Sequence, residues 1–534
     1  MFIGEWSGAN FHNLARILRC FHLASGLKVN FHKSVLYGIG VDNFEINNMA
    51  SILSCKSGSL PFTYLGLPVG ANMALVKNWR PVVERFESKL SIWKARTLSF
   101  GGKMTLLKAV LGNLSTYYFS LFSAPIQVLK QLERIRRKFL WGGCLDKNKV
   151  SWVPWFKVLA PKEHGGLGIG SLSSTNIALL VKWRIRFKNE PNQLWSRVVK
   201  AIHHGQRTWL SIPAKATNPG VWNNIIKAGK NLCQKNINVD NKLVVNLGRG
   251  DKTLFWIDKW ATTQPLKIVF PNLFSAQSDK KCTVQQRYMI QGGNTNWFWG
   301  GAQPISLTRD ANDWESCLQL LRNINIKENE VDSWLWQGAE GPEVYTVRNL
   351  RRELDFIERI AETKVLTWLN WTPLKVNCFL WRAVQNRIPT REALMIRNIT
   401  LPTILCPLCN IRTETTDHIL ISCEFANYVW LQIFSWIKVP MPQFLISVVE
   451  LFEFIRTYPI YKANKKAMYV ILTTTCWMIW KTRNELIFKG TNSSVSKIIG
   501  EVKACSFLWI RSRANVQELD WAKWRGFSFN KFPL

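Results

Sequence analysis

The stretch Cys406-Pro407-Leu408-Cys409, followed by His418 and Cys423, holds the strongest structural signal of this 534-residue chain. The CxxC spacing lets two thiols face one ion, and the imidazole and the third thiol complete four ligands. Such a closed Cys₃His set suits a structural zinc ion and leaves no open position for a substrate. The alternative is three buried cysteines and a capping histidine, but CxxC spacing and a four-ligand count occur together and favour zinc. We expect no disulfide, because oxidised pairs are rare inside cells and no secretory signal opens the chain.

The residues around these ligands form an ordered set of aromatic, basic and proline positions. Upstream stand Trp371, Pro373, Lys375, Phe379, Trp381, Arg382, Arg387, Pro389, Thr390, Arg391, Leu394 and Arg397, and downstream stands Trp430. The segment 347–430 resembles the zinc-binding domain that follows the polymerase in reverse transcriptases of plant non-LTR (LINE-type) retrotransposons. The resemblance implies a compact helical domain in which Cys406, Cys409, His418 and Cys423 hold the metal.

Three further expectations concern this metal site. Asp417 or a backbone carbonyl should orient the ring nitrogen of His418 that does not bind the ion. The helix that holds Trp371, Phe379 and Trp381 should cover the site as an apolar lid. Cys378 has no partner at CxxC spacing, so it is left out of the ligand set.

The composition describes a globular and strongly basic protein. Hydrophobic residues make up 47% of the chain and charged residues 20%, which excludes a disordered chain. Lys and Arg number 70 against 35 Asp and Glu, so the net charge of +35 favours a polyanionic partner, RNA or DNA. A membrane surface is the rival polyanion, but no apolar run is long enough to span a bilayer, and the apolar stretch 470–480 predicts a core helix. We expect an intracellular protein of the nucleus or cytoplasm, not a secreted one.

The N-terminal segment predicts a helix over 10–24 that Gly26 ends, followed by a strand from Val35. It resembles the segment just after the catalytic strand of the retrotransposon polymerase palm, where the family carries an aromatic-Ala-Asp-Asp motif immediately upstream. No Asp-Asp pair occurs in this sequence. The metal-binding carboxylates of the palm are therefore missing, no catalytic residue is assigned, and Mg²⁺ is expected only for a full-length polymerase.

The segment Phe62–Gly70 predicts a tight strand-turn-strand. By composition alone it fits any β-hairpin, and its place after the palm-like segment favours a specific one. It resembles the primer grip of the family, the hairpin that holds the growing 3′ end. The residues that carry this likeness are Tyr64, Leu65, Gly66, Pro68 and Gly70.

Residues 79–141 predict basic amphipathic helices, interrupted over 99–103 and ended once by Pro125. They resemble the family's thumb, a helical bundle that closes on the template–primer duplex. Phosphates of a nucleic-acid backbone need cations without sequence-specific contacts, which a helix face of Lys and Arg supplies; the alternative is a solvated basic face. The candidate contacts are Lys130, Arg134, Arg136, Arg137 and Lys138.

The rest of the chain carries weaker signals. Gly165-Gly166-Leu167-Gly168 lacks the spacing of a dinucleotide or P-loop motif and matches the post-thumb segment of the family instead. Within 205–345, short apolar runs predict small strands, including two over 333–347, and 275–296 predicts a flexible insert. Residues after 430 predict helices, and no spaced acidic set there fits a ribonuclease H site.

These predictions give a mainly α (α+β overall) chain of five parts. They are a palm remnant with the hairpin (1–75), thumb and connection helices (76–200), a linker region (205–345), the zinc-binding domain (347–430) and a C-terminal helical region (431–534). The resemblance implies a fragment of an RNA-directed DNA polymerase that keeps nucleic-acid-binding parts without catalysis of its own. The alternatives are a non-enzymatic zinc-dependent nucleic-acid-binding protein and a decayed element without maintained function. The sequence does not identify any protein partner.

Overall fold

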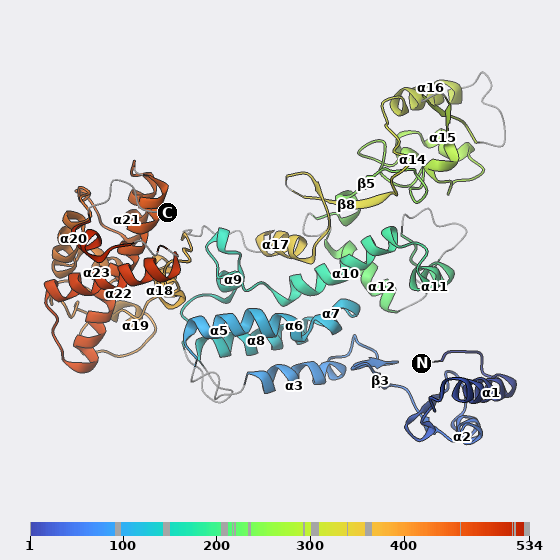
Figure 1. The fold of residues 1–534 in the computed structure, drawn as a ribbon, viewed down its shortest axis with the longest axis horizontal. Coiled ribbons are helices and arrows are strands. Elements are labelled where there is room, and N and C mark those ends of the chain that lie inside the picture. The colour runs from blue at the N-terminus through green and yellow to red at the C-terminus, as the bar shows by residue number, and fades with distance from the viewer. Residues whose placement is uncertain are drawn as a thin grey trace. The chain divides into compact units, whose positions relative to one another are not determined.

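The computed structural model describes residues 2–90, 98–142, 150–203, 212–215, 217, 220–232, 237–291, 294–300, 309–338, 340–357, 366–459, 461–514, 516 and 519–527. Helices dominate these residues and the sheets have two or three strands, as predicted for a mainly α chain with some β (Figure 1). The chain forms two compact units, residues 1–83 with 124–128, and residues 84–123 with 129–534.

The first unit begins with the predicted helix. Helix α1 spans Gly8–Ser25, and Gly26 ends it in the left-handed conformation at φ 72°, with its N–H donating to His22 O. Strand β1 (Val35–Tyr37) pairs in parallel with β2 (Lys56–Gly58), and helix α2 (Asn43–Ile52) connects the two strands in sequence. The 3₁₀ turns η1 and η2 span Phe31–Lys33 and Val76–Trp79.

The predicted strand-turn-strand is a two-stranded antiparallel hairpin. Strand β3 (Phe62–Tyr64) pairs with β4 (Leu67–Val69), with Thr63 opposite Pro68. Leu65 and Gly66 form its two-residue turn with φ values of 49° and 80°. Positive φ at both central residues is the turn geometry that matches the twist of a hairpin, and it suits Gly at the second position. Pro68 lies on a strand with a single neighbour, where its missing N–H costs no ladder bond.

Short helices and α8 form the basic helical region. Helix α3 spans Arg80–Lys89, α5 Phe100–Leu106, the π-helical turn η3 Leu107–Leu111, α6 Gly112–Leu114, α7 Thr116–Leu121 and α8 Ile126–Trp141. The interruption predicted over 99–103 is shorter than expected, because Ser99 is not helical but α5 begins already at Phe100, with the Ser99 hydroxyl accepting from Gly102 N. Gly101 is buried there, and a Cβ at this position would lie 3.1 Å from Leu374. Helix α5 packs closely against α18 (Leu374–Val384), which is distant in sequence, and this contact leaves little room for a side chain at position 101.

Helix α10 (Leu172–Asn189) is the centre of the middle region. Helices α9 (Trp155–Leu159), α11 (Leu194–His203) and α12 (Val221–Asn231) and the 3₁₀ turn η4 (Lys162–His164) surround it in sequence. One face of α10 packs on α17 (Val347–Ile357) through Ala178, Val181, Leu350 and Leu354. Asn176 ties α10 to α7 by donating to the carbonyls of Phe119 and Phe122, each at 2.9 Å.

The region 237–345 has a core of its own. Strand β8 (Ser333–Gln337) lies between β5 (Leu243–Asn246) and β9 (Pro342–Glu343), and β6 (Tyr288–Gln291) pairs with β7 (Asn294–Trp297). The remaining elements are α13 (Val239–Lys242), α14 (Leu266–Val269), α15 (Pro271–Ala276), η6 (Val284–Arg287) and α16 (Arg309–Leu321). A flexible insert over 275–296 is wrong for the described residues, because Cys282 and Val284 are buried with Phe255 and Trp256 in one core.

The C-terminal helices pack around α22, which spans Lys462–Lys489. The others are α18 (Leu374–Val384), α19 (Arg391–Met395), the π-helical turn η7 (His418–Ser422), α20 (Glu424–Trp436), α21 (Val448–Thr457), α23 (Val495–Arg513) and α24 (Trp521–Gly526). The stretch 470–480 lies inside α22 and is almost wholly buried, as a core helix should be. Among the described helices, none has the length and apolarity to cross a membrane.

Candidate metal centre

A tight loop presents the first two thiols. Cys406 N donates to Arg412 O at 2.7 Å, and a bridge between Leu405 and Thr413 closes the loop. The N–H of Asn410 donates a hydrogen bond to Cys406 O at 2.7 Å, and Asn410 has a φ value of 56°. Asn tolerates this left-handed conformation, so the residue after the CxxC motif turns the chain back and both sulfurs face the same side.

His418 and Cys423 flank one π-helical turn. His418 opens η7, and Cys423 N donates to His418 O at 2.8 Å where the turn ends. Cys423 is also the residue that precedes α20, so its sulfur lies at the N-terminus of a helix. Peptide dipoles at a helix N-terminus favour a negative charge, which suits a thiolate.

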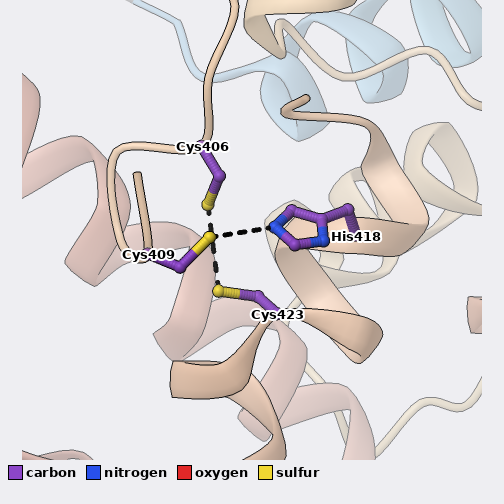
Figure 2. A group of neighbouring side chains, drawn as sticks. All are labelled: Cys406, Cys409, His418 and Cys423. Carbon is purple, nitrogen blue, oxygen red and sulfur yellow. Dashed lines mark hydrogen bonds between the residues drawn. The ribbon is translucent and has the colours of Figure 1, made fainter. Parts of the chain in front are cut away.

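The four side chains converge on one point, as Figure 2 shows. One ligand atom from each of Cys406, Cys409, His418 and Cys423 lies within 4.8 Å of all the others. The sulfurs of Cys406 and Cys423 are 3.8 Å apart, and Cys409 Sγ is 3.3 Å from His418 Nε2. Zn–S bonds of about 2.3 Å separate two tetrahedral sulfurs by about 3.8 Å, and the matching S–N edge is about 3.6 Å. The residues therefore fit a tetrahedral zinc ion.

The electrostatics of the site suit a metal as well. Burial lowers the pKa of His418, so its ring is neutral and offers a lone pair at neutral pH. The hydrogen bond between the thiols raises the pKa of Cys406 and lowers that of Cys423. A bound cation would displace the protons of the thiols, because a metal binds the thiolate form. All four cysteine and histidine groups are buried or half-buried, and none of the three thiols forms a disulfide.

Two expectations about the surroundings of the site are wrong. Ser422 Oγ, at 3.5 Å, is the neighbour of His418 Nδ1, whereas the Asp417 carboxylate accepts from Val448 N at 2.9 Å. The helix α18 is not a lid over the ligands. Phe379 packs on Trp477 and Trp480 of α22, and Trp381 donates to Gly165 O at 2.7 Å.

The sequence reasoning missed a buried ion pair that anchors the metal loop to α22. Arg483 donates to both carboxylate oxygens of Glu414, at 2.6 and 2.8 Å, and both residues are almost fully buried. Glu414 also accepts from Arg391 N at 2.8 Å. Glu414, one of two acidic residues between CxxC and the histidine, was the available signal, and its partner lies 69 residues away in the sequence.

The five basic residues of α8 that were predicted to contact phosphates differ in their exposure to solvent. Lys130, Arg134 and Arg137 are exposed and follow the i, i+4, i+7 spacing of one helix face, while Lys138 is half-buried. Arg136 is 1% exposed, and its guanidinium donates to Glu133 at 3.0 Å and to Gly170 O at 3.2 Å. Arg136 therefore faces the protein interior, and the prediction that it contacts a phosphate is wrong.

The primer-grip-like residues lie together in the first unit. Tyr64 and Leu65 are exposed, Gly66 and Pro68 are half-buried, and Gly70 is exposed with φ 81°. Tyr64 ends β3, Leu65 and Gly66 form the turn, Pro68 lies in β4, and Gly70 directly follows β4. The hairpin itself is confirmed, and a contact with a primer stays a prediction.

Comparisons with known proteins agree with this site. The family model described as "zinc-binding in reverse transcriptase" matches residues 345–430. An Arabidopsis thaliana protein named as a ribonuclease H protein, At1g65750, is 26% identical over 363 residues, which is 66% of this chain and 55% of that protein. This chain thus spans about half the length of that relative. The uncharacterized mitochondrial protein AtMg00310 of Arabidopsis thaliana is 30% identical over 148 residues, 28% of this chain and 92% of that protein. With its Cys₃His cluster inside the matched segment, the chain belongs to the plant retrotransposon-derived proteins that carry the zinc-binding domain of reverse transcriptases.

Proposed function

We propose that this chain is a nucleic-acid-binding part of a retrotransposon reverse transcriptase, in which α8 contacts the phosphate backbone of a template–primer duplex. The observation that supports this is that Lys130, Arg134 and Arg137 form one exposed row on a helix whose opposite face is buried. Three cations about one helical turn apart meet successive phosphates without reading bases.

We further propose that Cys406, Cys409, His418 and Cys423 hold one structural zinc ion. The ion would supply folding free energy and fix the loop against α20 and α22, and four protein ligands leave it no open position for chemistry. Because the sequence contains no Asp-Asp pair, the chain by itself should not extend a primer, which a primer-extension assay with and without chelator checks.

The salt dependence of binding tests the role of α8. Fluorescence anisotropy with a labelled RNA–DNA duplex gives the slope of log affinity against log salt for the zinc-loaded chain. Each phosphate contact contributes about 0.9 to that slope, so Lys130→Gln/Arg134→Gln/Arg137→Gln should lower it by about 2.7.

A charge-matched control separates the helix from the net charge. Lys489, Lys497 and Arg513 are exposed in the C-terminal helices, and Lys489→Gln/Lys497→Gln/Arg513→Gln removes the same three charges. The control should leave the slope near that of the wild type. Equal slopes in both triple variants would overturn the assignment of α8.

A further inference from the structure

A pocket of about 250 Å³ lies between the loop 159–170 and helix α17. Its basic lining comes from three places far apart in the sequence, η3, η4 and α17, all within the second unit. Five lining residues are cationic and two are acidic. The cations are Lys108, Lys162, Arg348, Arg351 and Arg352, and the acids are Glu163 and Asp355.

The two acids leave much of this positive charge uncompensated. Asp355 accepts from Ser174 Oγ at 2.7 Å and from Ser171 N at 3.3 Å, so its carboxylate also serves the start of α10. Glu163 reaches Arg352 at 3.6 Å, and both of these side chains are about half exposed. Exposed pairs of this kind contribute little.

Burial, more than repulsion between them, disfavours the charged forms of Lys108 and Arg351. Burial and the nearby Lys162 lower the pKa of Lys108 to about 8, and its Nζ donates to Leu167 O at 2.6 Å. Burial also lowers the pKa of Arg351; Asp355 opposes this shift, and Arg352, Arg136 and Arg348 add to it. The Nε atom of Arg351 is buried and has no hydrogen-bond partner within the described part of the chain. Buried guanidinium donors are normally satisfied, so this one points to an acceptor that the described residues do not provide.

The glycine-rich loop allows these side chains to approach. Gly168 and Gly170 have φ values of 63° and 77°, and a Cβ on Gly170 would lie 3.2 Å from Arg351 Nε. The loop amides are not the donors of a P-loop, because Gly168 N and Gly170 N donate to Ala160 O and Leu159 O. Any anion chemistry here comes from the side chains.

We propose that this pocket binds a phosphate group, supplied by the backbone of a nucleic-acid strand. The volume lies below the ~300–1,000 Å³ of pockets that enclose drug-sized ligands, which favours a single phosphate over a whole nucleotide. Arginine forks and lysines are the side chains that bind phosphate, by paired hydrogen bonds and by charge. The nucleic-acid source rests on the proposed function, whereas the phosphate site itself does not.

Calorimetric titration of the full zinc-loaded chain with inorganic phosphate tests the site directly. Arg348→Gln/Arg351→Gln should weaken phosphate binding about tenfold or more, because hydrogen bonds to charged groups are the strong ones. Arg348→Gln/Arg352→Gln changes two exposed residues and serves if the first variant fails to fold, as judged by its thermal melt. Lys489→Gln/Lys497→Gln is the matched control and should bind phosphate as the wild type does.

Duplex binding by the same variants identifies the source of the phosphate. The pocket variant should lower the salt slope by about one. Loss of phosphate binding with an unchanged slope would overturn the nucleic-acid source and leave a site for the free anion. A wild type that does not bind phosphate, or a folded pocket variant that binds it equally well, would overturn the site. The α8 triple variant should keep phosphate binding, so failure of the α8 proposal remains distinguishable.

Discussion

Cys406 and Cys423 lie at the separation that a tetrahedral zinc ion imposes on two sulfurs. The loop after CxxC turns back at Asn410, and one π-helical turn sets the spacing between His418 and Cys423. Local backbone geometry thus aims all four ligands, and a bound zinc ion would supply the attraction that offsets the cost of burying them.

At this scale the first prediction concerns one ligand. The wild type should bind one zinc ion per chain, and Cys409→Ser should lose it, because a serine hydroxyl keeps the shape but not the soft thiolate ligand. Metal analysis of the purified proteins measures the stoichiometry, and thermal melts with and without chelator measure the stability.

Cys378 provides the control for that experiment. It is buried on α18, and burial raises its pKa to about 12, so it stays a thiol at neutral pH. Cys378→Ser should therefore retain one zinc ion even where it lowers the melting temperature. A Cys409→Ser protein with full zinc and full stability would refute the ligand assignment.

At the scale of an element, α8 shows how one helix separates two uses of the same residue type. Arg136 and Arg137 are neighbours in sequence, but about 100° of helical rotation places one in the interior and the other in solvent. Glu133 is central to the buried side, since it accepts from Arg136, from Trp155 Nε1 and from Leu172 N. The buried face of α8 thereby holds the start of α10 in place.

The second prediction contrasts these two arginines. Arg136→Gln should destabilise the chain by about 3 kcal/mol, since it breaks a buried ion pair, and should leave the salt slope of duplex binding unchanged. Arg137→Gln should do the reverse, with stability within about 0.5 kcal/mol of the wild type and a slope lower by about 0.9. Denaturant unfolding and salt-dependent anisotropy measure the two effects. The same effect from both variants would contradict the assignment of the two faces.

At the scale of the whole molecule, the metal loop is built into the C-terminal helices. The turn η7 packs on α22 and α20, α20 packs on α23, and the Glu414–Arg483 pair joins the loop to α22. By contrast, α17 at the start of the matched segment packs on α10 through Leu350 and Leu354. The extent of an independent zinc-binding domain over 347–430 stays a prediction, and this packing favours a larger cooperative unit.

The third prediction follows from that packing. A fragment of residues 345–430 should bind zinc but unfold without a cooperative transition, because it lacks the helices that cover η7 and α20 and leaves Glu414 without Arg483. A fragment of residues 366–527 should bind one zinc ion and melt cooperatively. Circular dichroism melts of both fragments, with metal analysis, compare them. Cooperative melting of the shorter fragment at the same temperature would show that the later helices are dispensable.

The sequence by itself determined the features that depend on short spacings. Gly26 ends α1, Leu65-Gly66 turns the hairpin β3–β4, and CxxC with His418 and Cys423 forms the ligand set, since a few adjacent residues settle each backbone geometry. Only the tertiary structure decided which charges face inward and what they contact. Arg136 is buried against Gly170 and Glu414 against Arg483, and the half-buried Arg351 lines the same pocket as Lys108. Such pairs depend on the packing of helices distant in sequence. A helical period shows that a face exists, and packing decides whether that face meets solvent or the core.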